Sequence, residues 1–362
     1  MSGKKFCDTI DGCFSLSHIK GLGFRRQVSF DKSNNKWIEE IVINEPALNV
    51  KQEDLAKDLP GMAWDLLPMS RYRTALWHAL PNGANRQPFA SLYTSLGCPF
   101  SCTFCCINAP FGGSSFRYWP PEFMIEEFDK LHKMGITNIK IADEMFVMKP
   151  DHFMRLCQMI IDRGYKFNIW CYARVDITKP EYLETLKKAG VNWLALGIES
   201  GNKGVRKGVI KGRFDDIDIS SVVSTIRNHG INVIGNYIFG LPDDTEATMQ
   251  ETLDLAMEMN TEEANFYSCM AYPGSRLHKD MIDISCLPDE YAGYSQHSYT
   301  CKPLPTKTLT AAQVLAFRDE AWHKYHTNPA YVDMIYKEFG ETAWRETLAS
   351  TKIKLKRKLL GD

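Results

Sequence analysis

The stretch Cys98-Pro-Phe-Ser-Cys102-Thr-Phe-Cys105 decides how the rest of the chain is interpreted. It places three cysteines in the spacing C-x3-C-x2-C, directly after an apolar run from Phe89 to Leu96. A tight loop with this spacing can direct three thiolates toward one iron–sulfur cluster. Stable clusters usually have four cysteine ligands. Three ligands therefore leave one iron free for another molecule, as a catalytic metal site keeps one position open.

Two other interpretations of these cysteines stay open. A structural zinc site would need a fourth Cys or His at a matching spacing, and the sequence has no second C-x2-C or H-x3-H pair. A plain electron carrier would normally show a C-x2-C-x2-C run with a fourth cysteine nearby. Cys106 directly follows the third cysteine, but adjacent side chains diverge, so Cys106 is a poor fourth ligand to the same cluster.

With Phe104 before the third cysteine, the loop resembles that of the radical S-adenosylmethionine (SAM) enzymes. The resemblance implies a 4Fe–4S cluster on Cys98, Cys102 and Cys105, with SAM bound to the open iron. It further implies cleavage of SAM to a 5′-deoxyadenosyl radical, which abstracts hydrogen from an unactivated carbon of a small-molecule substrate. An electron donor such as flavodoxin or ferredoxin would then be a partner.

Length and composition set broad limits on the protein. A chain of 362 residues, 44% of them hydrophobic, predicts two to three domains with a large core. The net charge of −1 gives no reason to expect a nucleic-acid partner. No apolar run approaches the ~18 residues of a membrane span, and the N-terminus has no apolar leader. The eleven cysteines are expected to be reduced, which predicts a cytoplasmic protein.

The first part of the chain, residues 1–85, predicts a hairpin with strands near 24–30 and 37–44, followed by a proline-containing strap at 59–69. The strap resembles the segment that joins a cobalamin-binding domain to the barrel in the cobalamin-dependent branch of the family. The cobalamin domain itself is not evident, and its Asp-x-His-x-x-Gly motif is absent. The resemblance therefore implies that cobalamin is either unused, bound without a histidine ligand, or supplied by a separate protein.

Residues 86–275 alternate between apolar strands and amphipathic helices, which predicts an α/β fold with a parallel sheet. As in the family, six strands give a partial TIM-like (β/α) barrel. Residues 276–362 predict a mainly helical extension, with helices near 310–326, 329–337 and from 342, and a basic, solvated helix end at 352–358. The strands are expected near 89–96, 137–143, 167–173, 192–198, 232–239 and 264–271, and the barrel helices near 121–134, 151–163, 180–189, 216–229 and 245–259.

Chemistry in such barrels lies at the carboxyl ends of the strands, so the residues there are candidates for binding SAM. Asp143 and Glu144 match the position where the family places groups that bind the SAM ammonium, so the resemblance implies that one of them could hold it. Taken alone, the pair is more simply explained as a solvated loop or a helix cap. Arg174 could bind the SAM carboxylate, or simply pair with Asp176.

Two further strand ends carry the resemblance. Glu199 and Ser200 match the family segment that contacts the ribose or the methionine part of SAM. Ile238 and Gly240 match the backbone that borders the adenine, whereas Asp244 or Thr245 caps the next helix.

The sequence thus predicts a radical SAM enzyme, which would act as a methyltransferase if cobalamin is supplied. One alternative is the same barrel without cobalamin, catalysing rearrangement, epimerisation or dehydrogenation. The other is a non-enzymatic iron–sulfur or zinc-stabilised binding protein.

Overall fold

The structure is a computed structural model that describes residues 16–74, 87–209, 217–284 and 286–362. The chain divides into two compact units, Met1–Gly61 and Met62–Asp362. The first residue of the helix expected at 216–229 lies outside the described residues. Residues 1–15, where no apolar leader is expected, also lie outside them.

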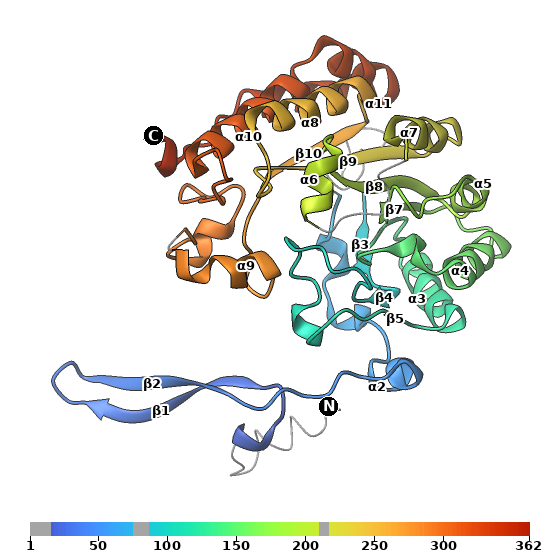
Figure 1. Ribbon diagram of the computed structural model, residues 1–362. Coiled ribbons are helices and arrows are strands. Elements are labelled where there is room, and N and C mark those ends of the chain that lie inside the picture. Colours follow the sequence, from blue (N-terminus) through green and yellow to red (C-terminus); the bar gives the residue numbers. More distant parts are fainter. Residues whose placement is uncertain (1–15, 75–86, 210–216, 285) are drawn as a thin grey trace. The chain divides into compact units, whose positions relative to one another are not determined.

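The first unit contains the expected hairpin. Strands β1 (Gly23–Asp31) and β2 (Lys36–Ile43) pair antiparallel, with a bulge between Gln27 and Ser29 (Figure 1). The Asp31 carboxylate stabilises the turn, because it accepts hydrogen bonds from the Ser33 N–H at 2.9 Å and the Asn34 amide at 2.7 Å. The Ser33 side chain contributes most to lowering the pKa of Asp31 to about 2. The unit also contains α2 (Leu55–Asp58).

The second unit contains a parallel sheet of six strands in the order β10-β9-β8-β7-β6-β3. Helices surround it, and β3 and β10 form the two unpaired edges, so the barrel is partial as predicted (Figure 1). The strands are β3 (Phe89–Leu92), β6 (Asn138–Ile141), β7 (Asn168–Arg174), β8 (Val191–Glu199), β9 (Asn232–Phe239) and β10 (Glu263–Ser268). The helices are α3 (Pro121–Lys133), α4 (Pro150–Asp162), α5 (Pro180–Lys188), α6 (Lys203–Gly208), α7 (Ile219–Asn228) and α8 (Glu246–Met259).

The strand expected at 89–96 is shorter than predicted. Strand β3 ends at Leu92, and β4 (Ser95–Leu96) pairs instead with β5 (Arg117–Tyr118) in a separate two-stranded sheet. The hydrogen bonds that Thr94 and Ser95 donate to Asp143 hold the chain where it leaves the main sheet. The chain reaches the cysteine motif directly after β4.

The two faces of the barrel strands have different surroundings. Ile139, Ile141 and Cys171 are at most 1% exposed, and Cys171 lies near Cys157 of α4, so this face packs against the helices. The opposite face points into the barrel lumen, where Lys140 and Tyr172 stay half-buried. We call this inner space the lumen, and its positions alternate with the buried ones along each strand.

An amide ladder occupies the lumen near the amino ends of the strands. Asn168 donates a hydrogen bond to Asn138 at 3.0 Å, and Asn192 donates one to Asn168 at 3.1 Å. These bonds satisfy polar groups that burial would otherwise penalise.

Helix boundaries follow from local sequence. Pro121, Pro150 and Pro180 occupy the first turns of their helices, where a missing N–H costs nothing. Thr245 caps α8 through a reciprocal capping box with Thr248, as one of the two expected caps.

The C-terminal region contains α9 (Arg276–Met281), α10 (Ala311–His326) and α11 (Pro329–Thr351). The two helices expected after residue 329 form one element that breaks at Gly340, whose φ is +81°. The stretch expected as a solvated helix end instead has no regular secondary structure from 353 to 357. Arg357 within it is 1% exposed, because its guanidinium forms two hydrogen bonds with Asp319 at 2.8 and 2.9 Å.

Among the described residues, no helix combines the length and the apolar character needed to cross a bilayer.

Candidate functional site

The site begins with the segment from Cys98 to Cys106, which we call the cysteine loop. Its turn is fixed by a hydrogen bond from the Cys105 N–H to the Cys102 carbonyl at 3.1 Å. The side chain of Asn108 spans the loop, accepting from the Cys98 N–H at 3.3 Å and donating to the Phe100 carbonyl at 2.9 Å. These bonds hold the backbone between the first and third cysteines in a defined shape.

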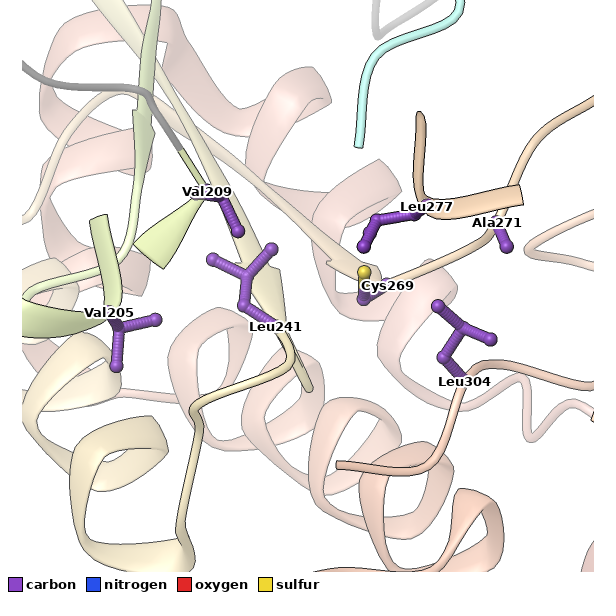
Figure 2. Close-up of a cluster of buried hydrophobic side chains, with 7 residues drawn as sticks. All are labelled: Val205, Val209, Leu241, Cys269, Ala271, Leu277 and Leu304. Carbon is purple, nitrogen blue, oxygen red and sulfur yellow. The ribbon is translucent and has the colours of Figure 1, made fainter. Parts of the chain in front are cut away.

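Phe104 attaches the cysteine loop to the core. Its ring packs against a cluster of buried apolar side chains that Figure 2 shows converging from α6, α9 and the segments after β9 and β10. Thr103 adds two backbone bonds to the same neighbourhood, donating to the Val209 carbonyl at 3.1 Å and accepting from the Leu277 N–H at 3.0 Å. The cluster consists of Val205, Val209, Leu241, Cys269, Ala271, Leu277 and Leu304.

The donor set fits a three-cysteine iron–sulfur cluster. Cys98 and Cys102 are half-buried and Cys105 keeps exposed surface, so the loop offers its thiols at an accessible edge. Among the described residues, no three His, Cys, Asp or Glu side chains gather closely enough to hold a single metal ion. A 4Fe–4S cluster does not require such a gathering, because its cysteines bind different irons.

The two carboxylates after β6 have separate environments. Asp143 is 1% exposed and accepts three hydrogen bonds, from the Thr94 N–H at 2.6 Å, the Thr94 hydroxyl at 2.5 Å and the Ser95 hydroxyl at 2.6 Å. Burial raises the pKa of Asp143 despite these bonds. Its oxygens brace the exit of β3, which makes Asp143 the poorer of the two candidates for contact with SAM.

Glu144 belongs to the lumen. Burial and, to a lesser extent, the neighbouring Asp143 raise its pKa to about 7, while Lys140 opposes the shift. Burial raises the pKa values of Tyr93 and Tyr172, and the charge of Glu144 is the second cause. The Glu144 carboxylate therefore lies close to these lumen residues. Glu144 is therefore the member of the pair that can meet a bound ammonium group.

Arg174 lies at the end of β7 and is 3% exposed. Its Nε and Nη2 donate to the two oxygens of Asp176 at 2.8 and 2.9 Å, which is the internal pair that the sequence left open. Its guanidinium also lies over the ring of Phe100, 3.9 Å from the centroid. Burial works against its charge, but Asp176 and the thiolates of Cys102 and Cys98 raise its pKa. Arg174 thus connects the barrel edge with the cysteine loop.

Glu199 and Ser200 end β8 in an unusual conformation. Glu199 has a φ of +67°, in the left-handed region that non-glycine residues rarely adopt, and a bulge separates it from Gly197. Such strain persists where surrounding structure imposes it, frequently at functional sites. Ser200 is fully buried, and its hydroxyl lies 3.2 Å from the Thr252 hydroxyl and accepts from the Asn202 N–H at 3.1 Å.

The end of β9 brings backbone to the lumen edge. Ile238 is half-buried, and Gly240 has a φ of +81° with no room for a side chain, because a Cβ would collide with Val314. The Asp244 carboxylate accepts from the Gly240 N–H at 3.0 Å and the Leu241 N–H at 2.9 Å. The turn is therefore rigid at the point where the chain leaves the sheet.

Sequence reasoning missed several lumen residues. Lys140 and Trp170 are partners in the parallel register of β6 and β7. Tyr267 of β10 lies near the same residues, because burial and then the charges of Tyr172, Glu263 and Glu199 raise its pKa. A signal was available for Lys140, because a charged residue between two isoleucines of a buried strand must point to the opposite face. Tyr267 had no such signal, because its exposure depends on β10 being an edge strand.

Comparison with known proteins agrees with this geometry. The Radical SAM superfamily model matches residues 92–256, which include the cysteine loop and four of the candidate strand ends. An uncharacterized methyltransferase of Pyrococcus horikoshii is 28% identical over 90% of this chain and 65% of its own length. Bacteriochlorophyllide d C-12(1)-methyltransferase of Chlorobaculum tepidum is 28% identical over 55% of this chain and 46% of its own length. The chain thus spans less than two thirds of either relative.

A solved structure shares the fold. The cobalamin-dependent SAM radical enzyme OxsB, with aqua-cobalamin bound, aligns over 97% of this chain and 53% of its own, with a TM-score of 0.62 and 16% identity. At this identity the likeness concerns the fold alone. The cysteine motif and the half-barrel agree with the family match, which assigns residues 92–256 of this chain to the radical SAM superfamily.

Proposed function

We propose that this chain is a radical SAM enzyme that abstracts hydrogen from an unactivated carbon of a small molecule. The observation that carries the proposal is the cysteine loop, which follows β4 and is connected through Phe100 to Arg174 at the carboxyl end of β7. Cys98, Cys102 and Cys105 would hold a 4Fe–4S cluster. When bound and reduced, that cluster supplies the electron that cleaves SAM to a 5′-deoxyadenosyl radical.

The strand-end residues would orient SAM. Glu144 would accept the α-ammonium, since it is a carboxylate within the lumen. Arg174 would bind the SAM carboxylate, while Asp176 holds its guanidinium at the end of β7. Glu199 would accept from a ribose hydroxyl or the methionine end. Asp143 would act behind these groups by holding the β3 exit in place.

The buried turns would bring the backbone to SAM. Ser200 would contribute its position more than its hydroxyl, which already has protein partners. Ile238 would pack on the adenine, and Gly240 would let the backbone approach it closely. By enclosing SAM, these residues would also exclude water from a reactive intermediate.

Methyl transfer is the outcome that we favour, because the relatives include proteins named as methyltransferases. It would need cobalamin, which a separate protein or a further segment would supply. The electron donor would be a flavodoxin- or ferredoxin-like protein. We assign the enzyme to the cytoplasm, since no disulfide joins the described cysteines and the cluster needs a reducing compartment.

The test is anaerobic reconstitution with iron and sulfide, followed by dithionite and SAM, with mass spectrometry of the nucleoside products. We expect 5′-deoxyadenosine from the wild-type chain and none from Cys102→Ala. Cys106→Ala is the matched control, because this thiol lies in the same loop outside the three-cysteine spacing and should leave the product unchanged. A wild-type chain that binds iron but forms no 5′-deoxyadenosine would contradict the proposal.

The second candidate is the same barrel working without cobalamin. Adding cobalamin to the same assay separates the two, with a panel of candidate substrates present. Methylated product together with S-adenosylhomocysteine supports methyl transfer, whereas an isomerised or dehydrogenated product formed equally well without cobalamin supports the alternative.

A further inference from the structure

Lys140 is a cation inside the barrel. It lies between the buried Ile139 and Ile141 on β6 and points to the opposite, lumen face. Its Nζ lies 4.3 Å from the centroid of the Trp170 ring and 5.2 Å from that of Tyr172. Two aromatic faces stabilise a cation without neutralising it, so its charge remains available to a ligand.

No described carboxylate completes an ion pair with this ammonium. Glu144 is near enough to favour the charged form of Lys140, yet burial is the larger effect and lowers the lysine pKa. Burial also raises the pKa of Glu144 to about 7, which weakens it as a permanent counterion. A half-buried cation without a paired anion is costly, and a substrate anion would offset that cost.

Trp170 provides a second, independent observation. It is 6% exposed, and its indole Nε1 has no hydrogen-bond partner among the described residues. Buried indole N–H groups usually find a partner. Trp170 stands opposite Lys140 in the β6–β7 register, and the Lys140 Nζ lies 4.3 Å from its ring centroid, so the two donors lie in the same layer of the lumen.

Flat aromatic side chains lie beside these donors. Tyr172 follows on the same face of β7, with its ring 4.7 Å from that of Trp170 in an edge-to-face arrangement. Opposite Tyr172 in the register, β8 carries only the methyl group of Ala195, so β8 places no bulky side chain against this ring. Asn236 and Tyr267, on β9 and β10, keep accessible surface on the inner side.

We propose that Lys140 and the Trp170 indole N–H form an anion subsite in the lumen, which receives a carboxylate or phosphate of a substrate with a flat apolar body. The aromatic rings would pack against that body while the two donors fix its charged end. Lys140 and Trp170 lie two residues beyond Asn138 and Asn168 of the amide ladder, toward the carboxyl ends of the strands, so the body would extend toward the cysteine loop. This inference rests on the proposed function, because it names the class of substrate that the proposed enzyme would take.

The test measures binding of probes that differ only in charge. 2-Naphthoate and 2-naphthyl phosphate carry the anion, and 2-naphthamide is the neutral counterpart. We would titrate each into the full-length, reconstituted chain by calorimetry. We expect the wild type to bind at least one anion about tenfold more tightly than the amide, and the stronger anion identifies the group that the subsite takes.

Variants connect that preference to the two donors. Lys140→Met should remove the preference for the anion, and Lys140→Arg should keep most of it. Trp170→Phe should reduce it severalfold by deleting the N–H while retaining a ring. Lys133→Met is the matched control, because this lysine is exposed on α3 of the same βα unit and should change nothing.

Equal affinity of the wild type for anion and amide would overturn the inference, and so would a preference that survives Lys140→Met. The outcome is separable from the proposed function. A wild-type chain that forms no 5′-deoxyadenosine but shows a Lys140-dependent preference refutes only the function. A chain that cleaves SAM with no such preference refutes only the subsite.

Discussion

Asp143 and Glu144 are adjacent carboxylates for which the structure predicts opposite consequences of mutation. Asp143→Ala leaves three donors without their acceptor, namely the N–H and hydroxyl of Thr94 and the hydroxyl of Ser95. A buried donor that loses its partner costs about 1–3 kcal/mol. The two hydroxyls can rotate toward other acceptors, so we expect a total loss of about 3–5 kcal/mol, a large part of the ~5–15 kcal/mol available to a folded protein.

The measurement is urea unfolding followed by circular dichroism, together with equilibrium binding of SAM. Glu144→Ala, the matched variant, should change the free energy of unfolding by less than ~1 kcal/mol and weaken SAM binding instead. Asp143→Asn provides a milder test if the alanine variant does not fold, because it keeps one oxygen for the Thr94 N–H. Asp143→Ala with wild-type stability and lost SAM binding would reverse the two roles and refute the reasoning.

Four further predictions concern the edge of the site. Because burial raises the pKa of Glu144 to about 7 and ammonium binding needs the ionised form, the Kd for SAM should fall as pH rises from about 6 to 8, and Glu144→Gln should remove that dependence. The raised pKa also means that Glu144 keeps its proton to a higher pH in the folded chain than in the unfolded chain. Its contribution to the free energy of unfolding should therefore fall as pH rises from 4.5 to about 7. Urea midpoints of the wild type and Glu144→Gln, measured across this pH range, would detect the difference. Gly240→Ala should destabilise the fold by about 2–4 kcal/mol in thermal or urea unfolding, since it combines a left-handed φ with a collision at Val314. Phe104→Ala should lower the free energy of unfolding by about 2 kcal/mol, which is less than the loss expected for a fully buried Phe. It should also lower the iron bound per chain, measured by colorimetric iron assay. Unchanged iron content would show that the loop holds its shape without this ring.

The sequence predicted well what depends on local pattern. Alternating apolar segments predicted the parallel sheet, and Thr245 was one of the two expected caps of α8. The sequence left a gap between two expected helices, at 329–337 and from 342, and the structure breaks the helix within that gap, at Gly340. These features depend on a few neighbouring residues, so they are readable without tertiary information.

What could not be predicted depends on partners distant in sequence. The role of Asp143 is decided by Thr94 and Ser95, about fifty residues earlier, so no local signal distinguishes it from Glu144. Arg357 was expected on a solvated helix end, but Asp319 and the carbonyls of the 296–298 segment bury it. A basic stretch alone does not reveal such an acceptor.

The cluster of buried apolar side chains against which Phe104 packs limits how far the protein can be truncated. Four of its seven side chains, Cys269, Ala271, Leu277 and Leu304, come after residue 256, where the family match ends. A fragment trimmed to the matched segment would therefore present all three thiols on a loop whose support has been cut away. Cofactor retention should consequently report on the folding of the C-terminal third, even though that third supplies none of the sulfur ligands.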